Sequence, residues 1–216
     1  MKKLIFILSI LILLGGCSGN RGNRKGSQVS VKDLAKSEVK KRYPIESGIV
    51  RSKSEAAGIE STIVTYFDKW GEWEATETTI PIKIMGQDMT SRRLEIIKGD
   101  DHWSIDLKEK TGTHFTRKRA ISSMGVDVEN VTDEVLGKMN MEKLGEEEHL
   151  GYKCQKFRIK SDKGTEMEYL MFGNVMMKMK GEAMGMKTTL EVTSIEETVP
   201  PKEVFEIPED VTITEE

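Results

Sequence analysis

Residues 167–179 read MEYLMFGNVMMKM, and this stretch decides the class of fold. Every second residue from Met167 to Met171 is apolar or aromatic, which is the period of a β-strand. Gly173-Asn174 follows, a pair typical of a two-residue hairpin turn, and the alternation resumes from Val175 to Met179. The pattern predicts two antiparallel strands on either side of a tight turn.

The same period of two recurs along most of the chain from Ile45 onward. Further alternating runs lie at 63–67, 80–84, 94–96, 103–107 and 186–192, and turn residues separate them at 68–71, 86–88, 99–101 and 110–112. Runs joined by such short turns pair as antiparallel hairpins. We therefore predict a mainly β fold of about ten strands, arranged as a strongly twisted sheet, a sandwich or a barrel.

One further run, from Tyr152 to Ile159, changes parity along its length. Tyr152 and Cys154 share one parity, whereas Phe157 and Ile159 share the other. A β-bulge near Gln155 would bring all four side chains to one face.

Two segments have the period of a helix instead. Residues 31–43 carry apolar side chains at helical spacing after a capping-box pattern at Ser30 and Asp33, and Pro44 would end that helix. Residues 131–139 place Val131, Val135, Leu136 and Met139 on one face, with two acidic residues in the first turn. The fold is thus expected to hold one or two helices.

The N-terminus predicts where the protein resides. A basic start at Met1-Lys2-Lys3 precedes an apolar run from 4 to 14 and the small pair Gly15-Gly16, directly before Cys17. That order is typical of an export signal. The apolar run would span only about 16 Å as a helix, too short for a membrane core of roughly 30 Å. A plain secretory signal with a chance cysteine is the alternative.

The stretch ending in Cys17 resembles the lipobox of bacterial lipoproteins. The resemblance implies that residues 1–16 are removed and that Cys17 becomes the lipidated N-terminus, so the protein would be anchored to a bacterial membrane. Residues 17–30 are rich in Gly, Ser and Asn and predict a flexible tether. Ser18 fits outer-membrane sorting if the bacterium has two membranes. Residues 31–216 are expected to form a single domain.

Composition excludes several classes of function. The chain of 216 residues has a net charge of −3 and no dense basic stripe outside the tether, which argues against nucleic acid as a partner. Cys17 and Cys154 are the two cysteines. Once Cys17 carries lipid, no intramolecular disulfide can form, so stability must come from packing.

Three short motifs occur in an order that resembles a family of exported bacterial proteins of unassigned function. They are Tyr66–Gly71 (YFDKWG), Gly151–Phe157 (GYKCQKF) and Pro201–Pro208 (PKEVFEIP). That family is similar to the LolA/LolB-like carriers of lipids and lipoproteins. The resemblance covers about residues 45–212. It implies a highly curved antiparallel half-barrel wrapped over one or two helices, with an apolar cavity for acyl chains.

Methionine is concentrated in one part of the chain, where seven lie between positions 167 and 186. Because Met is flexible and polarizable, such a cluster suits a surface that binds varied apolar ligands. Met177 and Met179 are expected to share one face. The predicted ligand-lining residues are Met139, Met167, Met171, Met177, Met179, Met186, Val135 and Leu136. Ordinary core packing explains the same pattern, and a Cu(I) site is a third interpretation.

Catalytic and metal sites are not predicted. Asp106 would face His114 if Ile105 pairs with Phe115, which makes either an acid–base pair or a plain cross-strand ion pair. The three histidines lack the spacing of metal ligands. Glu146-Glu147-Glu148 is expected in a solvated loop. No cofactor is predicted, and Cys154 is expected to be a buried apolar residue.

Two functions remain open. The first is a lipid-anchored, non-enzymatic envelope protein that binds an apolar ligand, either a lipid or the acyl chain of a lipoprotein, with transport of that ligand as one role. The alternative is an envelope assembly or stress-sensing module that binds a protein partner and uses the half-barrel only as a scaffold.

Overall fold

The computed structural model describes residues 41–84, 87–116, 131–160, 165–183 and 185–216. The chain divides into two units, Met1–Ser37 and Glu38–Glu216, and all described residues belong to the second. The predicted signal peptide, the lipidated Cys17, the tether and most of the predicted helix at 31–43 lie outside the described residues. The predictions made for them stay predictions.

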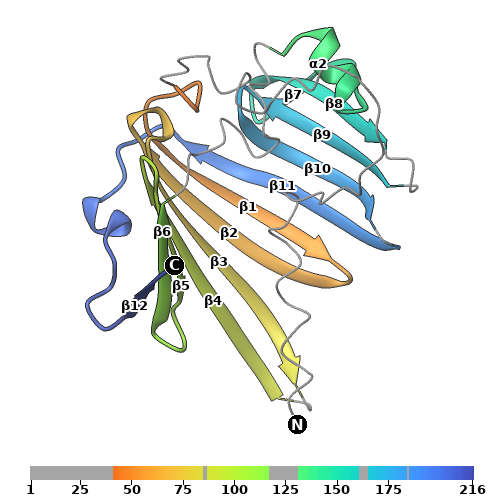
Figure 1. The fold of residues 1–216 in the computed structure, drawn as a ribbon. Coiled ribbons are helices and arrows are strands. Elements are labelled where there is room, and N and C mark those ends of the chain that lie inside the picture. The colour runs from red at the N-terminus through yellow and green to blue at the C-terminus, as the bar shows by residue number, and fades with distance from the viewer. Residues whose placement is uncertain (1–40, 85–86, 117–130, 161–164, 184) are drawn as a thin grey trace, which may run out of the picture. The chain divides into compact units, whose positions relative to one another are not determined.

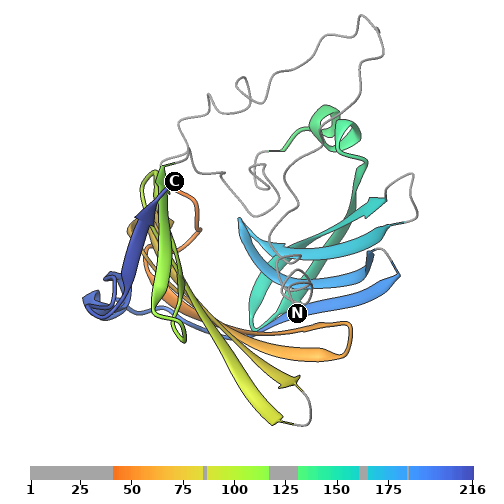
Figure 2. The ribbon, with the colours of Figure 1, turned by 60° about the horizontal axis from the view of Figure 1, so that its bottom comes forward.

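The described chain forms one twelve-stranded sheet (Figure 1). The strands are β1 (Gly48–Ala56), β2 (Ile59–Asp68), β3 (Trp73–Ile84), β4 (Gln87–Lys98), β5 (Asp101–Asp106), β6 (Thr111–Thr116), β7 (Met141–His149), β8 (Tyr152–Lys160), β9 (Glu166–Phe172), β10 (Val175–Ala183), β11 (Met186–Glu196) and β12 (Thr212–Glu215). Their order across the sheet is β12-β6-β5-β4-β3-β2-β1-β11-β10-β9-β8-β7. The sheet is open and curved, as Figure 2 shows, so the predicted mainly β fold is confirmed.

Sequential hairpins build both halves of the sheet, and β1 joins them by pairing with β11. The predicted turn at Gly173-Asn174 is confirmed, since β9 ends at Phe172 and β10 begins at Val175. One pairing departs from the antiparallel expectation: β12 runs parallel to β6. The chain between these two partners includes β7–β11, and it reaches β12 from β11 through a segment that contains the short 3₁₀ helix η2 (Lys202–Phe205).

Two strands differ from the sequence-based expectation. β12 was not predicted from the sequence, and β7 contains Glu146-Glu147-Glu148, which was expected to be a loop. That expectation for the glutamates is wrong because exposed strand positions tolerate charge when the neighbouring strand supplies cations. Lys153 on β8 pairs with Glu146 at 2.7 Å, and Lys156 lies 3.9 Å from Glu147.

The predicted bulge near Gln155 is also wrong. The register shift lies on β7, between Lys143 and Gly145, while β8 pairs with β9 without interruption. Cys154 and Phe157 therefore stay on opposite faces of β8, and each face has its own apolar cluster. Both parities are apolar here because both faces are covered.

Three apolar clusters stabilise the sheet. Cluster 1 contains Tyr43, Val50, Phe67, Cys154, Leu170, Val175, Met177 and Val192, so it joins β1, β2 and β11 to β8–β10. Cluster 2 contains Leu136, Met141, Phe157, Met167, Tyr169 and Met171. Cluster 3 contains Ala75, Ile96, Ile105 and Phe205. Cys154 is 1 % exposed in cluster 1, so its predicted burial is confirmed.

The predicted helix at 131–139 is confirmed as α2 (Asp133–Lys138), although it is shorter than expected. Thr132 caps it by accepting a hydrogen bond from the Val135 N–H at 3.4 Å. Glu134 and Lys138 form an i,i+4 ion pair of 2.6 Å on its exposed side. Leu136 is the residue of α2 that is buried, and it belongs to cluster 2.

The motif at Tyr66–Gly71 has a structural role. Lys69, Trp70 and Gly71 all adopt positive φ angles, which turns the chain sharply after β2. The turn places the Trp70 carbonyl oxygen to accept from the N–H groups of Arg42 (2.9 Å) and Tyr43 (3.1 Å). Gly71 is required because a Cβ there would lie 2.6 Å from the Tyr43 ring. The motif thus fixes the chain where it enters the sheet.

The motif at Pro201–Pro208 anchors the crossover to β12. η2 turns Phe205 into cluster 3, where it is 2 % exposed and meets the Trp73 ring edge-on at a centroid distance of 5.9 Å. Burying an aromatic side chain of this size contributes roughly 1.5–3 kcal/mol. The crossover is therefore held against the sheet on its way to β6.

Candidate functional site

Cluster 2 is the candidate site, because it places α2 against one face of β7–β10 and is built largely from methionine. Partly buried side chains of Val131, Val135, Met139, Ile159, Met176 and Met179 pack against its buried members. Six of these twelve side chains are methionines, whereas the whole chain has 13 in 216 residues. Their unbranched side chains can repack around a guest more readily than branched ones.

The site has a floor and a rim. The floor consists of the buried residues that the sheet holds by strand pairing, with Phe157 opposite Tyr169 and Tyr169 opposite Met179. The rim consists of half-buried side chains, among them Val135 and Met139 at α2 and Met176 and Met179 on β10. The rim is the part that an apolar ligand could touch without unfolding the sheet.

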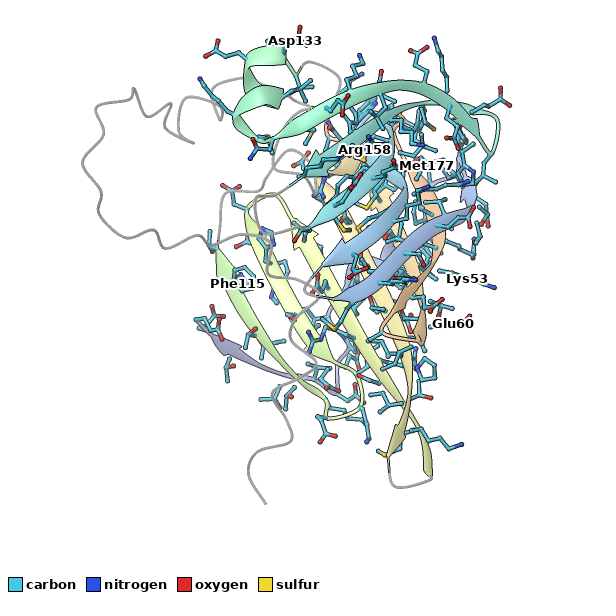
Figure 3. All side chains as sticks on the ribbon, turned by 90° about the vertical axis from the view of Figure 1, so that its right-hand side faces the viewer. Lys53, Glu60, Phe115, Asp133, Arg158 and Met177 are labelled. Carbon is cyan, nitrogen blue, oxygen red and sulfur yellow. The ribbon has the colours of Figure 1, made fainter. Side chains whose placement is uncertain are left out.

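Six of the eight predicted ligand-lining residues come together here, namely Val135, Leu136, Met139, Met167, Met171 and Met179. Met177 does not. It is fully buried in cluster 1, so the expectation that it shares a face with Met179 is wrong. The reason is a bulge on β10 between Met176 and Lys178, which breaks the alternation at Met177. Met177 is labelled in Figure 3.

Met186 also lies outside the cluster. It begins β11 and is one of the exposed large apolar side chains, at 41 % of its full area. Ligand binding by these eight residues remains a prediction. The rim residues are the ones that a ligand would contact first.

The predicted ligand-lining set missed six members of the cluster: Val131, Met141, Phe157, Ile159, Tyr169 and Met176. For two of them, the alternation of the sequence could have indicated their place in the cluster. Tyr169 shares its parity with Met167 and Met171, and Phe157 has the parity opposite to Cys154, which was interpreted as a bulge. No pattern in the sequence indicated Met141, because β7 is too polar to be recognised as a strand.

The two faces of β8–β10 differ in charge: one carries an ion-pair network, and the face with cluster 2 is apolar. On the face away from cluster 2, Glu168 accepts a hydrogen bond from Arg158 at 2.8 Å and pairs with Lys180 at 3.2 Å and Lys156 at 3.5 Å. These cations lower the pKa of Glu168 to about 2. Figure 3 labels Arg158 on β8.

Tyr169 is the polar group of cluster 2. It is 6 % exposed, and burial alone raises the pKa of its phenol. Its face therefore favours uncharged guests.

An open depression of about 450 Å³ lies over β9–β11, apart from cluster 2. It is lined by Glu166, Glu168, Lys180, Gly181, Glu182, Lys187, Thr188 and Thr189. None of the predicted ligand-lining residues belongs to this set, and its charged lining does not suit an acyl chain.

The expected Asp106–His114 pair does not form. β5 pairs with β6 so that His114 lies opposite Trp103, and Ile105 lies opposite Gly112 rather than Phe115. Asp106 instead accepts from the backbone N–H groups of Lys108 and Glu109 in the turn that follows β5. The predicted register is wrong because Gly112 lies inside β6 and not in the turn.

Among the described residues, no three His, Cys, Asp or Glu side chains are grouped as a metal site requires. Within the same residues, no helix has the length and apolarity needed to span a bilayer.

By sequence, the chain belongs to the family described as "Domain of unknown function (DUF4412)", which matches residues 47–175. No curated protein matches the chain. The matched region runs from just before β1 to the first residue of β10, so it includes most of the sheet and α2.

Similar folds occur among solved structures. An uncharacterized conserved protein from Thermus thermophilus aligns with a TM-score of 0.53 at 10 % identity, over 86 % of this chain and 97 % of that one. The MucA/MucB complex from Pseudomonas aeruginosa gives 0.44 at 10 % identity, over 78 % of this chain and 58 % of that one. A LolA superfamily protein from Nitrosomonas europaea gives 0.32 at 12 % identity, over 82 % and 98 %. The expectation of a family whose function is unassigned is confirmed by the family match.

Proposed function

We propose that the protein is a lipid-anchored, non-enzymatic component of a bacterial cell envelope that binds an apolar ligand, either a lipid or the acyl chain of a lipoprotein. The gathering of six methionines with α2 on one face of β7–β10 carries the proposal. Met-rich surfaces adapt to apolar guests of different shape. The lipobox-like stretch before Cys17 supports the anchor.

The arrangement suggests how a ligand would bind. A guest would lie along the half-buried rim, where Met139, Met176 and Met179 can change rotamer, while the buried floor keeps the sheet intact. α2 is only six residues long, and a short helix gains most of its stability from packing. A guest could therefore shift α2 at small cost and bury more apolar area beneath it.

Native mass spectrometry of residues 18–216 incubated with envelope lipids tests the binding. We expect a lipid-sized adduct of defined stoichiometry. Met179→Gln places a polar amide on the rim and should weaken retention about tenfold, which corresponds to about 1.4 kcal/mol. Met186→Gln is the matched control, because Met186 is exposed and outside the cluster; it should bind like the wild type.

A clean mass without adduct, unchanged after incubation, would contradict ligand binding and favour the alternative of a partner-binding module in the envelope. The anchor is tested separately with the full chain in a bacterial host. Cys17→Ser should release the protein from the membrane fraction, and an unchanged distribution would refute lipidation.

A further inference from the structure

One end of the sheet gathers the place where the described chain begins and several of its turns (Figure 1). Gly48, which begins β1, lies opposite Phe67 near the end of β2. The hairpin of β7 and β8 turns at the same end, since Tyr152 donates a hydrogen bond to Glu197, just after β11, at 2.8 Å. We call this the tether end. It comprises residues 41–48, the turns at 69–72, 99–100, 150–151 and 173–174, and residues 197–200.

Two bulky apolar side chains stand at the tips of turns in the tether end. Trp70 and Leu150 have φ angles of 55° and 53°, in the left-handed region that large side chains rarely adopt. Neither is buried, since Trp70 is half-buried and Leu150 is 45 % exposed. Core packing therefore does not explain why these residue types occupy such positions. Elsewhere in the described chain, the non-glycine residues with positive φ are small or polar, namely Ala57, Lys69, Lys110 and Asn140.

Val199 adds a third apolar side chain to the tether end. It is 70 % exposed, more than any other large apolar side chain that the structure describes. The far end of the sheet has exposed apolar residues as well, because Ile59 begins β2 and Met186 begins β11 there. Exposure alone therefore does not distinguish the two ends.

Lysine side chains lie over the tryptophan rings of the tether end. Nζ of Lys41 is 4.3 Å from the ring centroid of Trp70, and those of Lys69 and Lys98 are 3.8 Å and 5.3 Å from that of Trp73. Such pairs suit a bilayer interface, where the ring lies among headgroups and the ammonium group reaches water. The same turns and their flanks carry acidic residues, namely Asp68, Glu72 and Asp100. The mixture of both signs fits zwitterionic headgroups better than a strongly anionic surface.

The predicted anchor distinguishes the two ends. The chain enters at the tether end, where the N–H groups of Arg42 and Tyr43 donate to the Trp70 carbonyl oxygen. The 24 residues from Cys17 to Lys40 would reach about 25–30 Å as a flexible chain. The strands themselves are roughly 30 Å long at about 3.3 Å per residue. With the far end on the bilayer, those residues would have to extend along the whole sheet, whereas with the tether end on the bilayer they remain slack.

We propose that the tether end lies against the bilayer that holds the lipid of Cys17, with Trp70, Leu150 and Val199 among the headgroups. This inference rests on the lipid anchor of the proposed function and goes beyond it by assigning the surface that faces the membrane. The contact is apolar and interfacial, and the lysines and carboxylates around it stay in water.

The test measures which end approaches the lipid. The full chain, lipidated at Cys17 in a bacterial host, is reconstituted into phosphatidylcholine vesicles that contain a lipid with a nitroxide quencher on its headgroup. A fluorescent dye is attached through Val199→Cys or Ile59→Cys, while Cys154, at 1 % exposure, stays unlabelled under native conditions. We expect the dye at position 199 to lose most of its fluorescence. The dye at position 59, at the far end of strands roughly 30 Å long, should lose little.

Leu150→Asn separates membrane contact from folding. Asn tolerates a positive φ better than Leu does, so the variant should melt no lower than the parent protein. The dye at position 199 should be quenched less, because an apolar contact with the bilayer is lost. Met186→Asn is the matched control, since Met186 is similarly exposed, at 41 %, but lies at the far end; it should leave the quenching unchanged. Added salt should also leave it unchanged, because salt screens charges and not apolar contacts.

Equal quenching at the two positions, or stronger quenching at position 59, would overturn the assigned orientation and leave the anchor standing. Vesicle-bound protein with neither dye quenched would overturn it too, since the domain would then stand away from the bilayer. Quenching that disappears in salt would overturn the apolar contact. Protein that fails to float with the vesicles would overturn both the inference and the lipid anchor.

Discussion

His114 on β6 and Glu215 on β12 are joined by a contact of 2.6 Å between Nδ1 and Oε2, across the parallel pair at the edge of the sheet. Asp101 on β5 lies 3.2 Å from Nε2 of the same ring. Trp103 stacks on the imidazole at a centroid distance of 4.8 Å. The two carboxylates favour the charged imidazole, so His114 ties the C-terminal strand to the sheet by an ion pair.

The docking of β12 should therefore depend on pH. The hydrogen bond from Glu215, with that from Asp101, raises the pKa of His114 above its usual value. A raised pKa means that this contribution is complete below the unfolded value of about 6.5 and is lost as the pH rises through the folded value. Hydrogen exchange at residues 212–216, corrected for intrinsic rates, should show less protection above that pKa.

Glu215→Gln is the variant that isolates this effect. It should lower the pKa of His114, measured by NMR titration, and remove the pH dependence of exchange in β12. Asp210→Asn is the control, because Asp210 pairs with Lys110 at 2.6 Å and makes no contact with His114. A His114 pKa at or below its usual value in the wild type would contradict the assignment.

Two glycines should respond to alanine with opposite signs. At Gly181 on β10, a Cβ would overlap the carbonyl oxygen of Glu166 and lie 2.6 Å from Sδ of Met167. Because the carbonyl belongs to the paired strand, it cannot move alone, and Gly181→Ala should destabilise by about 1–3 kcal/mol. At Gly137 on α2 nothing lies within 4 Å, so Gly137→Ala should stabilise by about 0.5–1 kcal/mol. Urea denaturation measures both.

The two glycine results are independent checks on the structure. A neutral Gly181→Ala would mean that β9 and β10 are farther apart than described. A destabilising Gly137→Ala would mean that α2 packs more closely on its glycine side.

The sequence predicts features that depend on neighbouring residues better than features that depend on distant ones. The hairpin at Gly173-Asn174 and the helix near Val135 depend on neighbours in the chain, and both were predicted correctly. The register of β5 and β6 depends on which residues form the turn, and the placement of Gly112 was misjudged. The parallel pairing of β12 depends on a crossover that no local pattern announces.

The candidate site shows the same limit. Three of its six methionines, Met167, Met171 and Met179, were named from alternation, but alternation fails wherever an extra residue enters a strand. The bulge between Met176 and Lys178 moved Met177 to cluster 1. The double parity of β8 was interpreted as a bulge because burial on both faces of an antiparallel strand was not expected.

Glu168 should contribute to stability in an acid-sensitive way. Hydrogen bonds from Arg158 and Lys180 lower its pKa to about 2. A lowered pKa means that the contribution is present above the unfolded value of about 4.3 and is lost as the pH falls toward 2. Glu168→Gln should cost on the order of 1–2 kcal/mol at pH 7 and almost nothing near pH 2. Melting temperatures of the wild type and the variant between pH 2 and pH 7 measure this loss, with Glu182→Gln as the exposed control. An equal loss at pH 2 and at pH 7 would contradict the ion-pair network.

The methionines should separate into structural and dispensable ones by burial. Met177 is fully buried in cluster 1, where truncation leaves a cavity, so Met177→Ala should cost about 2–5 kcal/mol. Met186 is 41 % exposed, and Met186→Ala should stay within about 0.5 kcal/mol. Met179 is half-buried on the rim, so Met179→Ala should cost an intermediate amount.

Addition of a bound lipid should stabilise the wild type and Met177→Ala by similar amounts, because Met177 lies outside cluster 2. It should stabilise Met179→Ala by less. Chemical denaturation with and without lipid measures both quantities, and equal lipid stabilisation of Met179→Ala and the wild type would place the ligand away from the rim.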